Sequence, residues 1–378
     1  MSAEKQLSAQ ELYDPFIKNG VDYFCGVPDS ITGPFSHYLE EYAKDRHIIT
    51  ANEGNAIGLA IGYHIATGKT PLVYMQNSGL GNAIDPLVSL ADRSVFGTPM
   101  VLLIGWRGQP GEKDEPHHEK QGIITPDLLR DLEIPFDILS TDPSEAEKQI
   151  SQTARSATEL SRPHAILLEQ HSLAEYSDYD LRGNVHLLSR ETALGTVLGS
   201  VNEEAVVLTG IGKISRELFE YRSDSDQDLK QDLMVVGGMG HASSIALGIA
   251  IQKPERKVFC LEGDGSVLMH LGAIASIGSL APENFYHVVF NNGLHDSVGG
   301  VKTAAQDADI PAIARACGYK SAQSVHDAKS LVKGINEMQE VGGPALLEIK
   351  ISKGARLNLT RPTITPAQNK ADMMTFLG

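Results

Sequence analysis

Two glycine-rich turns in the second half of the chain carry oxygen ligands suited to a divalent metal ion. KVFCLEGDGS is typical of a buried strand that ends in Gly263-Asp264-Gly265-Ser266, where a helix begins, and a second apolar strand, about 30 residues further on, ends in Asn291-Asn292. Glycine lets backbone N–H groups approach a phosphate, and the helix N-terminus favours the anion. Asp264 would repel a bare phosphate, but Mg²⁺ or Ca²⁺ between the two groups removes the repulsion. We therefore expect a metal-bridged diphosphate site with Asp264, Asn292 and the backbone carbonyl of Leu294 as metal ligands, and turns without a ligand are the weaker alternative.

The stretch TANEGNAIGLAIGYHIATG, residues 50–68, places one carboxylate on an apolar helix face. A helix over this stretch puts Glu53 on one stripe with Ile57, Ala60, Ile61 and His64, a spacing that is typical of a buried face. Burying a charged group is costly unless something pairs with it, so Glu53 needs a partner. A solvent-facing acid that interacts with the helix dipole is the alternative interpretation.

Short apolar runs alternate with helix-length segments along the whole chain, which is typical of parallel sheets with helices on both faces. The 378 residues suffice for two such α/β domains, each a doubly wound parallel sheet. A polar stretch around residue 185 reads as a linker, so we place the domains at 1–184 and 185–378, the second with a C-terminal tail from about residue 353. The glycine-rich turns directly follow strands, where open parallel sheets bind their ligands.

Composition excludes several classes of partner. The net charge of −16 disfavours nucleic acids and membrane surfaces, and an anionic substrate would need a local cluster of cations. The three cysteines, Cys25, Cys260 and Cys317, are too widely spaced to suggest a zinc site or a disulfide framework. The start of the chain shows no signal pattern, and no apolar run is long enough for a membrane helix, so we expect a cytoplasmic protein.

GDGS followed by Asn-Asn resembles the signature of the thiamine diphosphate enzymes, and the helix at Glu53 resembles the one that carries their glutamate. The resemblance implies thiamine diphosphate and Mg²⁺ as cofactors. It also implies that Glu53 hydrogen-bonds N1′ of the aminopyrimidine ring and so promotes formation of the C2 ylid. In that role, burial would raise the pKa of the carboxyl and let it share a proton with the ring nitrogen.

The resemblance covers nearly the whole chain. The interval from Glu53 to Asp264 leaves no room for the middle domain of many related enzymes, so it implies a pyrimidine-binding domain followed directly by a diphosphate-binding domain. In the family these two faces meet across subunits, which implies a homodimer or a higher homo-oligomer. The segments VVGGMGH and TGIGKIS resemble the other cofactor-binding turns, with Met239 between the two rings and the Gly237 carbonyl at the 4′-amino group. The cofactor-binding residues so implied are Glu53, Thr209, Gly210, Gly237, Met239, Gly240, Asp264, Gly265, Ser266 and Asn292.

The loop GWRGQPGEKDEPHHEKQG, residues 105–122, gathers cations in an acidic chain. Arg107 and Lys113 in this loop suit a substrate with a second anionic group, such as a phosphonate or a sulfonate. A solvated loop in which neighbouring acids cancel these charges is the alternative. GVPDSITGPF, GWRGQPG, DEPHHEKQG and NNGLHDSVGG together resemble the phosphonopyruvate decarboxylases, with the sulfopyruvate decarboxylases next. That resemblance implies conversion of 3-phosphonopyruvate to phosphonoacetaldehyde and CO₂ through the ylid and an enamine, a step of phosphonate biosynthesis.

The same resemblance proposes acid–base and substrate residues. His118 and then His117 are the acid–base candidates, and Asp29 and Ser30 are expected across the thiazolium ring from Glu53. His295, Asp296 and Ser297 are expected at the same cavity, together with Arg107 and Lys113. Turn formation or helix capping is the alternative role for Asp29, Ser30 and residues 295–297.

Two other functions stay open at this point. One is decarboxylation of sulfopyruvate or of another 2-oxo acid. The other is a non-catalytic nucleotide-binding module, against which the chain has no GxGxxG fingerprint with a ribose-binding acid and no GxxxxGK[ST] loop. The sequence also leaves open Mg²⁺ against Mn²⁺, and a dimer against a tetramer.

Overall fold

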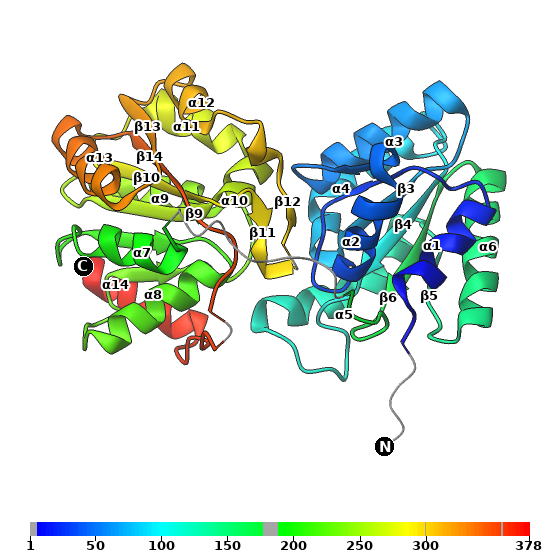
Figure 1. Ribbon diagram of the computed structural model, residues 1–378. Coiled ribbons are helices and arrows are strands. Elements are labelled where there is room, and N and C mark those ends of the chain that lie inside the picture. Colours follow the sequence, from blue (N-terminus) through cyan, green and yellow to red (C-terminus); the bar gives the residue numbers. More distant parts are fainter. Residues whose placement is uncertain (1–5, 177–187, 299, 357) are drawn as a thin grey trace. The chain divides into compact units, whose positions relative to one another are not determined.

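The computed structural model describes residues 6–176, 188–298, 300–356 and 358–378. It divides into two units, Met1–Asp180 and Leu181–Gly378. The predicted boundary between residues 184 and 185 lies outside the described residues. Each unit holds a six-stranded parallel sheet flanked by helices (Figure 1), which confirms the predicted fold class, and the described residues form no third domain.

The first unit is built around a sheet of order β2-β1-β3-β4-β6-β5. Its strands are β1 (Phe24–Gly26), β2 (His47–Ile49), β3 (Leu72–Gln76), β4 (Met100–Gly105), β5 (Phe136–Ile138) and β6 (Pro163–Leu168). Its helices are α1 (Ala9–Lys18), α2 (Gly33–Tyr42), α3 (Glu53–Thr67), α4 (Leu80–Pro86), α5 (Pro116–Asp131) and α6 (Pro143–Leu160). Short helical turns are η1 (Lys44–Arg46), η2 (Asn77–Gly79) and η3 (Leu87–Ala91).

The second unit is built around a sheet of order β13-β14-β10-β9-β7-β8 and a separate pair, β11-β12. Its strands are β7 (Val206–Thr209), β8 (Asp232–Met234), β9 (Val258–Gly263), β10 (Phe285–Asn291), β11 (Leu294–His295), β12 (Val301–Lys302), β13 (Ser321–Val325) and β14 (Ala345–Lys350). Its helices are α7 (Arg190–Leu198), α8 (Lys213–Asp224), α9 (Ala242–Gln252), α10 (Asp264–Met269), α11 (Gly272–Leu280), α12 (Ile310–Ala316), α13 (Ala328–Val341) and α14 (Pro366–Leu377). Short helical turns are η4 (Asp296–Val298) and η5 (Ala304–Gln306).

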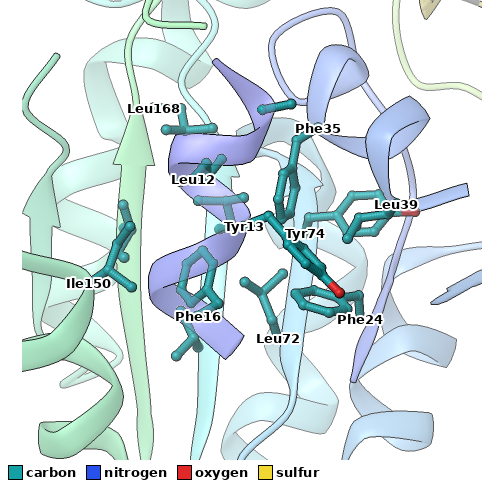
Figure 2. Packing of buried hydrophobic residues seen from close by; sticks show 14 of the residues in the cluster. Leu12, Tyr13, Phe16, Phe24, Phe35, Leu39, Leu72, Tyr74, Ile150 and Leu168 are labelled. Carbon is teal, nitrogen blue, oxygen red and sulfur yellow. The ribbon is translucent and has the colours of Figure 1, made fainter. Parts of the chain in front are cut away.

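Both faces of the first sheet are apolar, which explains why its strands read as unbroken hydrophobic runs. In β3, Leu72 and Tyr74 belong to one core cluster, whereas Val73 and Met75 belong to another, because successive strand residues point to opposite faces. Helices α1, α2 and α6 cover the first of these faces, where Phe16 packs among the side chains shown in Figure 2. Helices α3, α4 and α5 supply side chains to the second.

The two sheets share one topology, although the sequence shows no repeat. If the strands of each main sheet are counted from the first strand of that unit, both sheets run 2-1-3-4-6-5. The strand order reverses next to β1 in the first unit and next to β7 in the second. In open parallel sheets, ligands bind beyond the carboxyl ends of the strands at such a reversal. Functional side chains are therefore expected after β1 and β3, and after β7 and β9.

The C-terminal tail packs on the second unit. Arg356 forms ion pairs with Glu191 and Glu220. The side chain of Asn369, in α14, accepts a hydrogen bond from the Met234 N–H (2.9 Å) and donates one to the carbonyl of Asp232 (2.7 Å). No helix among the described residues is long and apolar enough to cross a membrane.

Candidate functional site

A pocket of the second unit lies at the reversal between β7 and β9. It is formed by the turns that follow β7, β9 and β10, and its lining includes Lys213, Met239, Asp264, Ser266, Asn292 and Leu294. The three residues predicted as metal ligands thus line one pocket, although they come from two different strand ends.

Asp264 is the buried acid of this pocket. It begins α10, is 2% exposed, and accepts hydrogen bonds from the Thr303 hydroxyl and the backbone N–H of Asn292. Burial raises the pKa of its carboxyl to about 6. No described residue forms an ion pair with it. A carboxylate, an amide oxygen and a backbone carbonyl around one cavity are hard oxygen donors, so the residues present fit a divalent ion that carries a diphosphate.

A hydrogen-bonded chain beneath the pocket joins two of the predicted cofactor turns. The Ser266 hydroxyl donates to Glu262 Oε2 (2.6 Å) and accepts from the Gly240 N–H (3.1 Å). Glu262 is fully buried, and its Oε1 lies 2.9 Å from Nε2 of His287. The GDGS turn and the turn at Gly240 are thereby held together. Sequence analysis missed Glu262 and His287. Glu262 is a charged residue inside the apolar run VFCLEG, and this is the signal that could have revealed the hydrogen-bonded side chains.

The other predicted cofactor residues of this unit divide into two groups. Met239 and Gly265 line the pocket, and Gly237 lies partly exposed, two residues before Met239. Thr209, Gly210, Gly237 and Gly240 do not belong to its lining. The cofactor contacts of both groups stay predictions.

Two hydroxyls fix the turn after β7. The Thr209 hydroxyl lies 2.8 Å from the Ser215 hydroxyl, which donates to the Gly210 carbonyl at 2.9 Å. The wall of the pocket is made by residues 211–214, which follow Gly210. Thr209 therefore shapes the turn, whereas the next residues face the cavity.

The segment after Asn292 contributes His295 and Asp296 to the pocket lining. Burial lowers the pKa of His295 to about 4, which keeps the imidazole neutral at physiological pH. Asp296 is already bound, because it accepts hydrogen bonds from Arg190 Nη1 (3.1 Å) and the Gly354 N–H (3.3 Å). The side chain of Ser297 lies outside the described part of the structure.

Glu53 is the first residue of α3 in the first unit, and it is 5% exposed. Its Oε2 accepts a hydrogen bond from Asn82 Nδ2 at 2.8 Å. Burial raises the pKa of the Glu53 carboxyl, the bond from Asn82 opposes this shift, and the charge of Asp29 adds to it. A Cβ at Gly79 would lie 2.5 Å from Cγ of Glu53, so only glycine leaves room there for the carboxylate. The predicted buried stripe is confirmed for Ile57, Ala60 and Ile61, whereas His64 at its end is partly exposed.

Asp29, in the turn after β1, is also buried. Its Oδ1 accepts hydrogen bonds from the N–H groups of Ile31 (2.5 Å) and Thr32 (3.2 Å), and Oδ2 accepts one from the Thr32 hydroxyl (3.0 Å). The carboxylate therefore organises the turn before α2, which is the alternative role considered above. Burial nevertheless raises the pKa of Asp29. A Cβ at Gly105, at the end of β4, would lie 2.6 Å from Oδ2, so this acid also depends on a glycine.

Arg107 and Asp114 form an ion pair within the loop of residues 105–122. Arg107 Nε donates to Asp114 Oδ2 at 2.8 Å and Nη2 donates to Oδ1, while Nη1 donates to the hydroxyl of Ser30 at 2.6 Å. The charge of Arg107 is thus shared with an acid of the same loop, as the solvated-loop alternative anticipated in part. Lys113 is exposed. Sequence analysis had not identified Asp114 as the residue that orients Arg107.

The His117 and His118 rings lie side by side at the start of α5, with their centroids 4.0 Å apart and their planes tilted by 46°. His118 is 6% exposed, and its Nδ1 has no hydrogen-bond partner among the described residues. Burial lowers the pKa of His118 to about 4, with His117 and Arg107 adding to the shift, and it also lowers that of His117. A neutral, buried imidazole with a free nitrogen can accept or relay a proton.

Known proteins match the chain along nearly its whole length. Residues 9–128 match the thiamine pyrophosphate enzyme N-terminal TPP binding domain, and residues 210–349 match the C-terminal TPP binding domain. A phosphonopyruvate decarboxylase from Streptomyces viridochromogenes is 34% identical, over 92% of this chain and 89% of that protein, and one from Streptomyces hygroscopicus is 31% identical, over 95% and 91%. A sulfopyruvate decarboxylase from Methanosarcina acetivorans is 26% identical, over 94% and 93%. The chain therefore belongs to the thiamine pyrophosphate enzymes, in the family of the phosphonopyruvate decarboxylases.

Proposed function

We propose that this enzyme converts 3-phosphonopyruvate to phosphonoacetaldehyde and CO₂ in the cytoplasm, with thiamine diphosphate and Mg²⁺, as a step of phosphonate biosynthesis. The observation that supports this substrate assignment is the 34% identity with a phosphonopyruvate decarboxylase over 89% of its length. Two buried acids, Glu53 and Asp264, support the cofactor chemistry, because each sits at the strand ends of its own unit where such a ligand binds.

The proposed roles follow from the contacts of each side chain. Asp264, Asn292 and the Leu294 carbonyl hold Mg²⁺, and the turn at Ser266 receives the diphosphate. Thiamine diphosphate supplies a nucleophilic carbon and an electron sink when bound. Glu53 holds a proton at N1′ of the aminopyrimidine ring, a role that fits its burial and raised pKa. His118, neutral at physiological pH, serves the proton transfers to the substrate carbon with His117 beside it.

We propose a homodimer as the smallest active form, with the substrate, a small anionic 2-oxo acid, as the other partner. Support comes from the family resemblance, in which the Glu53 domain of one subunit meets the Asp264 domain of another. Analytical ultracentrifugation should show at least two chains per particle. A particle of one chain with full activity would contradict the dimer.

The substrate assignment is tested by offering phosphonopyruvate, sulfopyruvate and pyruvate with thiamine diphosphate and Mg²⁺, and by identifying the aldehyde formed. We expect phosphonoacetaldehyde and the highest kcat/KM with phosphonopyruvate. Sulfopyruvate is the second candidate, because a sulfopyruvate decarboxylase is 26% identical over 93% of its length. Preference for sulfopyruvate or pyruvate would overturn the assignment, and a reaction without added Mg²⁺ after chelation would contradict the metal site.

Gly79→Ala should displace the Glu53 carboxylate without unfolding the chain. The φ of Gly79 is −68°, which suits any residue, so the only obstacle is the Cβ at 2.5 Å from Glu53 Cγ. We expect kcat to fall about 10²-fold, because an ångström of misplacement has that order of effect. Gly81→Ala, two residues on, is the matched control, since nothing lies within 4 Å of its Cβ position. Equal kcat in the two variants, measured at saturating cofactor, would show that Gly79 does not position Glu53.

Arg107→Lys should weaken substrate binding while keeping the charge of the loop. Lysine loses the fork that binds Asp114 and Ser30 together, so a cation near the second anionic group of the substrate is no longer oriented. We expect KM for phosphonopyruvate to rise about tenfold, with a smaller rise for pyruvate, which lacks that group. Arg130→Lys, at an exposed site in the last turn of α5, the helix that follows Arg107, should leave both KM values unchanged. An equal rise for both substrates would argue against a phosphonate contact.

A further inference from the structure

Two cations, Arg190 and Lys213, line the pocket that contains Asp264. Arg190 is 8% exposed and fully engaged. Its Nε and Nη2 bind the Glu217 carboxylate at 2.8 and 3.0 Å, and its Nη1 binds Asp296 at 3.1 Å. Two acids on one guanidinium leave it no charge to offer an incoming anion. Among the described residues that line this pocket, Lys213 is therefore the cation that can contact an anionic ligand.

Lys213 differs from Arg190 in having no partner of its own. It is the first residue of α8, directly after the glycine-rich turn TGIG, and its side chain is partly buried. It makes no hydrogen bond or ion pair with any residue that the structure describes. Burial lowers the pKa of its ammonium group, and the charge of Asp296 counteracts this shift. Leaving an ammonium partly buried and unpaired is unfavourable, so the position calls for an anionic ligand.

The negative charge of the proposed ligand would supply the partner that the Lys213 ammonium group lacks. A diphosphate is multiply charged, and one divalent ion that is also bound by Asp264 neutralises only part of it. The excess negative charge lies in a recess where solvent screens it less than in bulk water. An ammonium group acts on phosphate as a point charge and needs no fixed approach geometry, which suits a flexible side chain at the rim of a turn.

We propose that Lys213 binds the cofactor diphosphate directly, as the one cation of the described pocket that is free to do so. The proposal rests on the proposed function, because it takes thiamine diphosphate as the occupant of this pocket. Gly212, before it, has a φ of +111°, a conformation that favours glycine, and both residues line the pocket.

The test measures binding of thiamine diphosphate at fixed Mg²⁺ by isothermal titration calorimetry, without turnover. We expect Lys213→Met to weaken binding about 10- to 100-fold, and Lys213→Arg to stay within a few-fold of the wild type, because it keeps a cation. Lys329→Met is the matched control, since Lys329 is an exposed lysine in the first turn of another helix, α13, of the same unit. Binding of thiamine, which has no phosphate, should be equally weak in all four proteins.

Three results would overturn the proposal or separate it from the proposed function. Equal affinity of the Lys213→Met and Lys329→Met variants for thiamine diphosphate would show that Lys213 does not bind the diphosphate. A rise only in the KM for phosphonopyruvate, at saturating cofactor, would assign the lysine to the substrate instead. A wild-type protein that binds no thiamine diphosphate would defeat the proposed function itself. The apo Lys213→Met variant should unfold at the same or a higher temperature than the apo wild type, because methionine removes the unpaired ammonium group, and such a result excludes misfolding as the cause of a weaker affinity.

Discussion

Glu53→Gln should leave a folded chain that binds its cofactor and decarboxylates about 10³-fold more slowly than the wild type. Glutamine keeps the shape of the side chain and can still accept the hydrogen bond from Asn82. It cannot exchange a proton with N1′ of the aminopyrimidine ring, and proton transfer by a positioned group contributes about 10²- to 10⁴-fold. The measurements are kcat at saturating thiamine diphosphate and the dissociation constant of the cofactor.

The stability of this variant supplies an independent control. Because burial raises the pKa of Glu53 in the folded chain, the fold binds its proton more tightly than the unfolded chain does. The contribution of Glu53 to the free energy of unfolding of the apo wild type therefore falls as the pH rises from about 4.5 toward the raised value. Glutamine carries no such penalty, so the variant should unfold at the same or a higher temperature at neutral pH. A slow variant that also unfolds early would have lost activity through misfolding, and a variant with wild-type kcat would refute the role of Glu53.

Asp264→Asn should abolish the Mg²⁺-dependent part of thiamine diphosphate binding, and activity with it. Asn keeps the hydrogen bond from Thr303 but loses the only carboxylate among the proposed metal ligands. We expect affinity for the cofactor, measured by calorimetry with and without Mg²⁺, to become independent of the metal. Asp228→Asn, an exposed acid of the same unit, is the control and should bind as the wild type does. Retention of a Mg²⁺ effect in the Asp264 variant would place the metal elsewhere.

The features that could be predicted from sequence are those that depend on local pattern. Apolar runs at regular intervals gave both sheets, and the helix at Glu53 follows from its stripe, with Asn52 as the N-cap. The meeting of Asp264 and Asn292 was also predictable, because parallel strands present their carboxyl ends on one edge of the sheet. Each of these inferences needs only the period of an element and the direction of its strand.

The features that were missed depend on which side chain meets which across the fold. Acids of the loop, Asp114 among them, were the alternative partners of its cations, but no periodicity shows that Asp114, seven positions on, is the one that binds Arg107. Glu262 reads as a strand residue until Ser266 and His287 are seen on either side of it. Whether Thr209 or Lys213 faces the pocket depends on the backbone conformation of the turn between them. The two glycines of this turn allow several conformations, so the sequence does not specify which one forms.

Asn369 gives the C-terminal helix a role unrelated to catalysis. Strand β8 forms one edge of the second sheet, and the amide of Asn369 occupies the Met234 N–H and the Asp232 carbonyl, as a neighbouring strand would. An uncovered edge of this kind recruits strands from other chains and promotes aggregation. Chains that end before α14 should therefore aggregate at high concentration while they still retain catalytic activity. An affinity tag is for the same reason better placed at the N-terminus.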